Sequence, residues 1–267
     1  IRIAGSLVEA ATGQVPFAAD TAVTMPTLTA GTDYAIYVCT DRSVRADASF
    51  SAPSGYTTST SRQIGGFHYA LANLNVDSTP NINAYSLWDL KWRPACADPR
   101  GMVLVAGAFW ADIYLLGVNH ITAGASAAGQ TIADGASPPK IPAAFGGDGS
   151  AGYSTLTRYE AGEVMTAYGK RLPQLSEFAA LAYGVTEGQS YGSDVGSTGH
   201  YAGYTSKWGI EQAVGHMWVW GADGGGPYAA TAWASDTVGR GQDYNVPDFA
   251  LFGGSWSNNV ASGSRCS

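Results

Sequence analysis

Short apolar runs separated by turn residues dominate the first 95 positions, and no long amphipathic stretch occurs there. Residues 34–39 form a continuous apolar and aromatic run between Asp33 and Asp41, which predicts a buried central strand. Further strands are predicted at 1–4, 6–9, 21–25, 66–70 and 86–92. Because strands this short bury apolar area only against a second layer, they favour a small β-sandwich.

The pattern changes after a turn cluster at residues 94–101. One or two strands are predicted at 101–116, and a long Gly- and Ser-rich surface loop at 123–155. Helical spacing of apolar residues then predicts helices at 158–168 and 175–183, each ending at a glycine. Short strands at 218–220 and 249–256 are predicted on either side of a Gly-rich loop at 221–247.

These elements predict an α+β, β-rich fold in two domains. We place the β-sandwich at residues 1–96 and a second domain at residues 97–267. A chain of 267 residues can bury a large core. Aromatic residues make up 12% of the chain and 35 residues are glycine, a composition that fits packed rings joined by tight turns.

The charge distribution and the lack of long apolar runs argue against nucleic acid and membrane as partners. The net charge is -7, and the pI is near 4.9. Most of the acidity follows Cys96, because six basic and seven acidic residues come before it and eight basic and fourteen acidic residues after it. Without a basic patch we expect no nucleic-acid partner, and without an apolar run of about 18 residues we expect no membrane insertion. The chain opens without Met inside a predicted hairpin, so we expect a fragment of a longer protein.

Residue types that carry catalysis or bind metals are scattered along the chain. Cys39, Cys96 and Cys266 are too dispersed for a disulfide framework and lack metal-ligand spacing. The Gly-rich stretch at 146–150 lacks the ending of a phosphate loop. Four aspartates in Gly-rich loops lack the spacing of a calcium loop; they are Asp194, Asp223, Asp236 and Asp243. We therefore predict no catalytic residue, no required metal and no cofactor. Whether the protein binds Ca²⁺ is left open by the sequence.

We expect His68, His120 and His216 to be buried and to serve in packing. His68 and His120 lie in apolar contexts, and His216 lies in a Val-Gly-His-Met-Trp stretch that reads as a strand. A catalytic base needs partners that the spacing does not supply.

Tyrosine and tryptophan instead alternate with Gly and Ser over the last third of the chain. The rings are Tyr183, Tyr191, Tyr201, Tyr204, Trp208, Tyr228, Trp233, Tyr244 and Trp256. Such mixtures also build antibody paratopes, where rings supply contact area and small polar residues supply adaptable hydrogen bonds. A single ring is better explained by core packing, whereas the group as a whole favours a binding face.

Three segments in a fixed order carry a family resemblance. They are Gly-Lys-Arg-Leu-Pro at 169–173, Gly-Ile-Glu-Gln-Ala-Val-Gly-His-Met-Trp-Val-Trp at 209–220, and Leu-Phe-Gly-Gly-Ser-Trp-Ser-Asn-Asn at 251–259 leading to Ser264 and Arg265. Together they resemble the C-type lectin-like fold of formylglycine-generating-enzyme relatives. Residues 17–54, 85–93, 98–120 and 145–151 further resemble the phage tropism determinants, so that the resemblance covers nearly the whole chain.

The resemblance implies a receptor-binding protein at the tip of a phage tail fibre, in the virion. It implies a homotrimer that contacts other tail-fibre proteins and docks on a bacterial cell-surface receptor, protein or glycan. Positions diversified by a retroelement match Ser255, Ser257, Asn258, Asn259 and Ala261, and constant positions match Gly254, Trp256, Ser264 and Arg265. We therefore predict a receptor-binding site of Ser255, Trp256, Ser257, Asn258, Asn259 and Ala261.

Two departures and two alternatives accompany this hypothesis. The family has a further N-terminal β-prism domain and continues beyond the equivalent of Ser267, so we expect part of the binding surface to be absent. One alternative is a diversified ligand-binding protein displayed by a bacterium. The other, less favoured, is an oxidase or hydrolase on the same fold. Its copper chemistry would need a second cysteine near Cys266.

Overall fold

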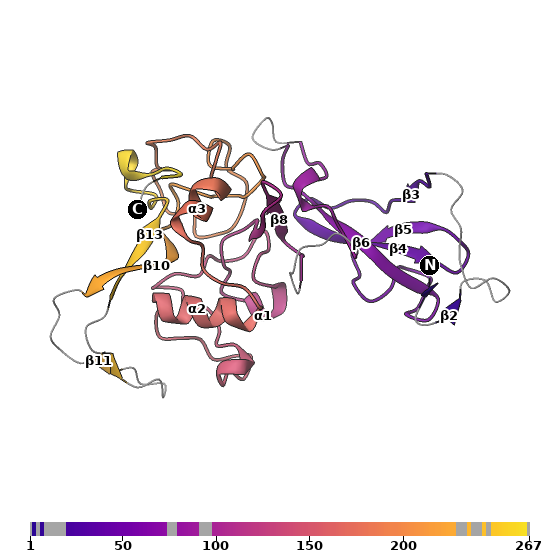
Figure 1. Ribbon diagram of the computed structural model, residues 1–267, viewed down its shortest axis with the longest axis horizontal. Helices are drawn as coiled ribbons and strands as arrows, with labels where there is room; N and C mark the ends of the chain where they lie inside the picture. The colour runs from indigo at the N-terminus through magenta and orange to yellow at the C-terminus, as the bar shows by residue number, and fades with distance from the viewer. Residues whose placement is uncertain are drawn as a thin grey trace.

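A computed structural model shows an elongated molecule with a strand-rich part at one end and a mixed part with the helices at the other (Figure 1). The structure describes residues 2–3, 6–7, 20–73, 79–90, 98–227, 234–235, 242–243 and 247–265. The predicted boundary at Cys96 lies outside these residues.

The strand-rich part is built on one five-stranded sheet in the order β3-β5-β4-β6-β7. Strand β4 pairs antiparallel with both β5 and β6, whereas β3 runs parallel to β5. The strands are β3 (Val23–Thr24), β4 (Thr32–Cys39), β5 (Val44–Asp47), β6 (Ser61–Tyr69) and β7 (Trp88–Asp89). A second, two-stranded sheet of β1 (Arg2–Ile3) and β2 (Ser6–Leu7) contacts β6 through β1.

The central strand is β4, as the apolar run at 34–39 predicts. Its two faces are both covered: Tyr34 stacks on Phe67 on one face, and Tyr37 packs near Phe50 on the other. Cys39 is fully buried at the end of the strand. Of the predicted strand at 86–92, β7 confirms only residues 88–89, Ser86 lies instead in the 3₁₀ helix η1 (Ala84–Ser86), and residues 91–92 lie outside the described residues.

The mixed part contains short helices and strand pairs. They are β8 (Met102–Val105), β9 (Phe109–Asp112), α1 (His120–Ala123), η2 (Ala143–Phe145), α2 (Arg158–Ala167), α3 (Leu175–Leu181), β10 (Val219–Pro227), β11 (Ala234–Ser235), β12 (Gln242–Asp243), β13 (Pro247–Phe252) and η3 (Asn259–Ala261). Among the described residues of this part, three antiparallel strand pairs form, namely β8 with β9, β10 with β13 and β11 with β12. A β-rich α+β fold is therefore confirmed.

Both predicted helices form. Thr157 and Glu160 cap the start of α2 with a reciprocal capping box, and Gly169 adopts a left-handed φ of 66° just past its end. Val164 on α2 and Phe178 on α3 are buried. No helix in the described part of the chain has the length and apolar character that crossing a membrane requires.

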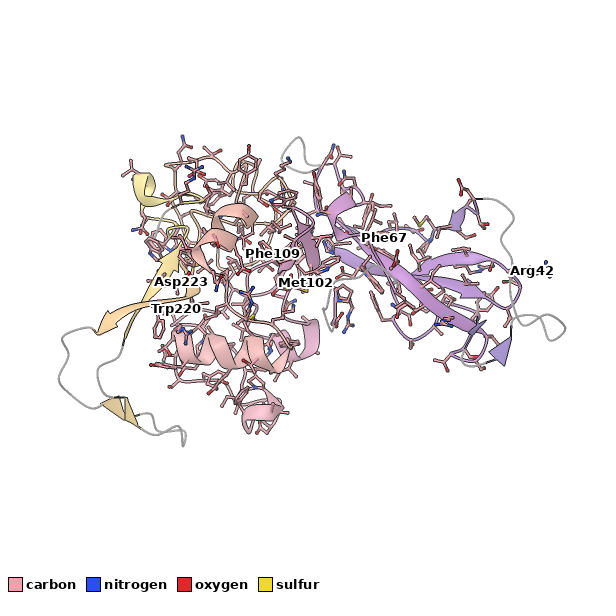
Figure 2. All side chains as sticks on the ribbon, viewed as in Figure 1. Arg42, Phe67, Met102, Phe109, Trp220 and Asp223 are labelled. Carbon is pink, nitrogen blue, oxygen red and sulfur yellow. The ribbon has the colours of Figure 1, made fainter. Side chains whose placement is uncertain are left out.

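Strand β10 is longer than predicted, since residues 221–227 extend it through the expected loop. Its partner β13 explains the difference. A side chain at Gly221 would place a Cβ 2.5 Å from the Phe252 ring, so only glycine lets the two strands approach this closely. Trp220 and Asp223 lie along this strand (Figure 2), and Asp223 accepts a hydrogen bond of 2.6 Å from the backbone of Leu175.

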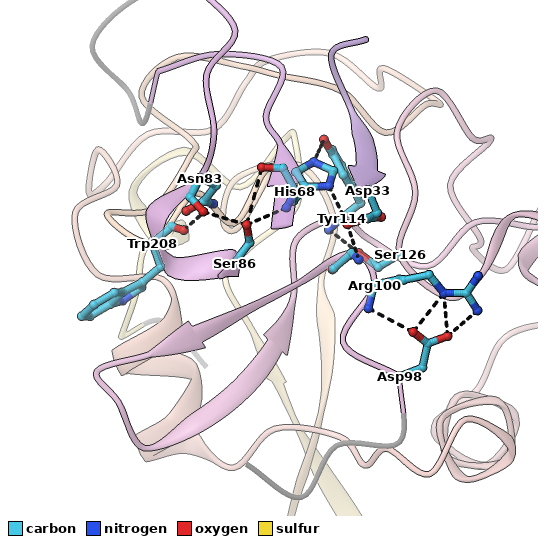
Figure 3. A network of polar contacts seen from close by, with 10 residues as sticks. Asp33, His68, Asn83, Ser86, Asp98, Arg100, Tyr114, Ser126 and Trp208 are labelled. Carbon is cyan, nitrogen blue, oxygen red and sulfur yellow. Dashed lines mark hydrogen bonds and ion pairs between the residues drawn. The ribbon is translucent and has the colours of Figure 1, made fainter. Parts of the chain in front are cut away.

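A buried polar network joins the two parts (Figure 3). Asp33 and His68 come from the five-stranded sheet, and Tyr114 follows β9; His68 contacts both over 3.0 Å. Asn83 adds a second connection by donating 2.9 Å to the carbonyl of Trp208. The core of the mixed part lies beside this junction and includes Phe178, Phe252 and Val103.

Candidate functional site

The candidate site is the terminal loop, residues 253–264, which follows β13. Gly253 and Gly254 have left-handed φ values of 88° and 77°, and they turn the chain away from the strand. Phe178 would lie 2.9 Å from a Cβ at Gly253, so glycine is needed there for space as well as for conformation. The loop closes where the amide of Gly263 donates to the carbonyl of Gly253 over 3.2 Å.

Ser255 and Asn258 stabilise a turn inside the loop. The Asn258 side-chain oxygen accepts hydrogen bonds from both the amide, at 2.9 Å, and the hydroxyl of Ser255. The amide of Asn258 donates back to the carbonyl of Ser255 over 3.2 Å. Between these two residues, Trp256 and Ser257 are exposed at the tip of the turn. The bond from the amide of Asn258 to the carbonyl of Ser255 closes a four-residue β-turn.

The flanking segment, residues 187–192, runs beside the terminal loop and is bonded to it at four residues. Gly188 and Gly192 donate their amides to the carbonyls of Ser262 and Trp256, over 2.7 and 2.9 Å. Ser190 donates its hydroxyl to the Asn259 side chain over 2.9 Å. Glu187 accepts from the amide and the hydroxyl of Ser264, over 3.0 and 2.5 Å. Hydrogen bonds from the flanking segment therefore hold the terminal loop along one side.

The central segment, residues 214–216, lies between the flanking segment and the terminal loop. The amide of Gly215 donates to Gly253, and its carbonyl accepts from the amide of Tyr191. The carbonyl of His216 accepts from the amide of Trp256 over 3.0 Å. The predicted strand at 216 is wrong, because β10 begins at Val219 and His216 forms only an isolated bridge with Ser255. His216 is nevertheless buried, as expected.

The structure brings the predicted site residues together in one loop. Ser257 and Asn259 are exposed, and Ser255 and Asn258 are partly buried by their mutual bonds. Ala261 lies in η3, and its side chain is outside the described part. Among the predicted constant residues, Gly254 and Ser264 are buried, whereas Arg265 is exposed.

Sequence reasoning missed Val260 and the flanking segment. Val260 is 85% exposed, more than any other large apolar side chain described. The pattern of apolar residues would place such a valine in a core, so nothing in the sequence signals its exposure. The flanking segment has no motif, although Tyr191 was among the ring residues singled out.

The aromatic residues predicted to form one binding face lie in different places. Tyr191, Tyr201 and Tyr204 gather around His216, whereas Trp208 lies near the junction and packs edge-on against Tyr85 at 4.9 Å. Tyr183 is exposed beside Lys207. Tyr228, Trp233 and Tyr244 lie outside the described residues. Burial raises the pKa of Tyr201 and Tyr204, so both hydroxyls stay protonated at neutral pH.

A cavity of about 850 Å³ lies in the mixed part, and Ser255 and Trp256 of the terminal loop contribute to its wall. Apolar side chains such as Met165, Phe178 and Leu251 line most of it. Trp256 lines this cavity and as a whole residue is 36% exposed.

His200 and Glu211 are titratable groups with structural partners. His200 contacts the buried Glu211 at 3.1 Å, and Thr205 donates to the same carboxylate over 2.6 Å. The hydrogen bond to Glu211 raises the pKa of His200. Within the described ranges, no three His, Cys, Asp or Glu side chains gather as a metal site. Cys96 and Cys266 lie outside those ranges.

Comparisons with known proteins agree on one family. The family domain described as the Mtd second domain matches residues 2–89. The chain is 55% identical over 276 residues to the tail fiber receptor-binding protein of Bordetella phage BPP-1, covering 98% of this chain and 72% of that protein. The U1 variant of the Major Tropism Determinant is 54% identical with a TM-score of 0.91, covering 98% of this chain and 72% of that one. Its M1 variant is 56% identical with a TM-score of 0.89, covering 95% and 71%.

Similarity at this level defines the class of protein, which is a bacteriophage tail fibre protein. Within that class, the chain belongs to the family of the major tropism determinants. The resemblance of residues 17–54, 85–93, 98–120 and 145–151 to the phage tropism determinants is thereby confirmed.

Proposed function

We propose that the chain is a receptor-binding protein of a phage tail fibre and that the terminal loop attaches the virion to a molecule on the bacterial surface. One observation carries this proposal: the loop's backbone is bonded to the central and flanking segments, while Trp256, Ser257, Asn259 and Val260 are exposed. Rings among small polar residues on a rigid support are typical of a binding face. The names of the relatives support the same function.

The loop also suits a diversified face. We propose that the side chains at Ser255, Ser257, Asn258, Asn259 and Ala261 vary, while Gly254, Trp256, Ser264 and Arg265 stay constant. Ser257 is the freest of these positions, because its side chain is exposed at the tip of the turn. Ser255 and Asn258 bond each other, so we expect their substitutions to be correlated.

The assembly proposed for the function is a homotrimer joined to other tail-fibre proteins. Three copies of a weak site would gain avidity on a surface that carries many receptors. We propose residues 1–96 as a supporting domain and residues 97–267 as a C-type lectin-like binding domain. We propose that binding needs no cofactor and that the protein is not an enzyme.

A cell-labelling experiment tests the binding face. The purified, fluorescently labelled chain is incubated with a panel of bacterial strains that includes Bordetella, and labelling is measured by flow cytometry. On a strain that is labelled, Ser257→Arg should reduce labelling about ten-fold, since a buried bulky charge at a contact costs more than 1.4 kcal/mol. Ser59→Arg is the matched control in an exposed loop of the strand-rich part, and it should leave labelling unchanged. Equal labelling by both variants would place the binding surface elsewhere.

Sequencing tests the diversification separately. The 3′ end of the gene is sequenced deeply in a phage population grown from one clone. Substitutions concentrated at the five proposed positions, with codon 256 constant, are the expected result. A uniform sequence would reject active diversification and leave a binder of fixed specificity.

A further inference from the structure

The face proposed above is supported from below by one buried imidazole. The His216 ring is 1% exposed and is enclosed by Tyr191, Tyr201 and Tyr204, each with its ring centroid 4.8 Å away. Tyr191 stacks at an interplanar angle of 22°, and Tyr204 meets the imidazole edge-on at 87°. Aromatic pairs in these geometries contribute beyond the area that they bury.

The polar atoms of this ring have an unusual arrangement. Nδ1 lies 3.1 Å from the carbonyl of Val214, an acceptor, so Nδ1 carries the hydrogen. Nε2 is buried and has no hydrogen-bond partner among the described residues. Burial lowers the pKa of His216, which keeps the ring neutral. The Nδ1 bond fixes the plane of the ring, so the ring can orient the tyrosines that pack on it.

Two of these tyrosines, Tyr191 and Tyr204, connect the imidazole to the flanking segment. Tyr191 belongs to that segment, and its own amide is bonded to the central segment. Tyr204 donates its hydroxyl to the carbonyl of Ser190 over 2.8 Å. Gly192, which follows Tyr191 in the sequence, donates its amide to the carbonyl of Trp256. The amide of Trp256 in turn donates to the carbonyl of His216. The contacts form a closed ring from His216 through Tyr191 to Trp256 and back.

We infer that His216 is the positioning residue of the terminal loop, and that Tyr191, 40% exposed beside Trp256, forms a fixed part of the same face. Only the consequence for receptor binding rests on the proposed function; the positioning itself is a property of this chain. The inference extends the binding face from the variable positions to a ring that diversification does not change.

Amide hydrogen exchange tests the positioning without a receptor. His216→Ala should speed exchange of the Trp256 and Gly192 amides about ten-fold or more, because local opening exposes both hydrogen bonds, while the Val38 amide in β4 stays protected. His216→Phe, which keeps an aromatic ring but loses the Nδ1 bond to Val214, should restore only part of the protection.

A matched control separates positioning from general loss of stability. His120 is also a buried histidine stacked edge-on against a tyrosine, Tyr168, at 5.6 Å, but it lies on α1. His120→Ala should lower the melting temperature without speeding exchange at Trp256. If His120→Ala speeds exchange at Trp256 as much as His216→Ala does, or if His216→Ala leaves it unchanged, the inference is wrong.

An exposed substitution guards against a variant that fails to fold. Tyr191→Ala removes a ring that is 40% exposed, and it should also speed exchange at Gly192 and Trp256. Tyr183→Ala, at a tyrosine that is 59% exposed and outside the cluster, should not. Unchanged exchange in Tyr191→Ala would overturn the closed ring of contacts.

Cell labelling then tests the consequence. On a strain labelled by the unsubstituted chain, Tyr191→Ala should reduce labelling about ten-fold, in the range of a central interface residue, and Tyr183→Ala should not. If exchange changes as expected but labelling does not, Tyr191 is no part of the face, and that half of the inference is wrong. Failure of the proposed function is distinguishable, because Ser257→Arg would then also leave labelling unchanged.

Discussion

The imidazole Nε2 of His68, on β6 of the five-stranded sheet, lies 3.0 Å from the hydroxyl of Tyr114 in the mixed part. The opposite nitrogen contacts Asp33, whose carboxylate also accepts from the amide of Gly101 over 3.0 Å. With Nδ1–H donating to Asp33, Nε2 accepts from the Tyr114 hydroxyl. The network thereby makes one buried polar connection between the two parts of the molecule (Figure 3).

Removing the hydroxyl should weaken this connection. Tyr114→Phe leaves the buried Nε2 of His68 without a donor, and we expect a loss of about 1–3 kcal/mol in the free energy of unfolding. Urea unfolding followed by tryptophan fluorescence measures it. The control is Tyr56→Phe, which removes an exposed hydrogen bond to Asp41 and should cost less than about 1 kcal/mol. Equal losses in the two variants would contradict a role for the junction.

The pair of His200 and Glu211 should make part of the stability depend on pH. The pKa of His200 is raised in the folded state, so its stabilising contribution is complete below the unfolded pKa, about 6.5, and is lost as the pH rises through the folded pKa. His200→Asn should therefore destabilise more at acidic pH than at alkaline pH.

His120 should show the opposite sign. Its pKa is lowered, mainly by burial, so the neutral ring contributes stability above about pH 6.5 that is lost as the pH falls through the folded pKa. The destabilisation caused by His120→Asn should therefore shrink in acid. Unfolding curves for both variants across the acidic to alkaline range check the two signs, and parallel profiles would contradict them.

Two glycines near the terminal loop offer a matched test of close packing. Gly215 and Gly188 have φ values of 68° and 69°, so alanine at either position has similar backbone strain, about 1–2 kcal/mol. A Cβ at Gly215 would also lie 2.8 Å from the Gln189 carbonyl, whereas none of the described atoms lies within 4 Å at Gly188. Gly215→Ala should therefore cost about 1–3 kcal/mol more than Gly188→Ala in thermal or urea unfolding.

Asn259 should restrict what diversification can place in the loop. Its φ is 42°, a left-handed conformation that asparagine and glycine tolerate and β-branched residues do not. Selection of a library randomised at codon 259 for folded protein should enrich Asn, Asp and Gly and deplete Val and Ile. The same library at codon 257 should show no such bias. Equal acceptance of Val at both codons would contradict the expected backbone strain of a β-branched residue at position 259.

The amino-acid sequence alone was enough to place several local elements and, through the resemblance of residues 17–54, 85–93, 98–120 and 145–151 to the phage tropism determinants, to indicate the family. The capping residues Thr157 and Glu160 and the apolar spacing place α2, and the apolar run at 34–39 places β4, because these signals act between near neighbours in the chain. Loops were predicted less well: residues 221–227 became strand only because β13 lies beside them. The site residues within 255–261 could be named from the motif. The hydrogen bonds that hold their loop against the flanking and central segments could not be predicted.

The support of the terminal loop comes from contacts between residues that are far apart in the sequence. Ser190 and Asn259 are 69 residues apart, and His68 and Tyr114 are 46 apart, yet each pair is in hydrogen-bond contact. No periodicity reports such contacts, because they depend on where loops without regular structure come together. The exposure of Val260 and the enclosure of His216 by three tyrosines arise in the same way. Composition supplied the rings, and packing over long sequence separations chose which of them surround one imidazole.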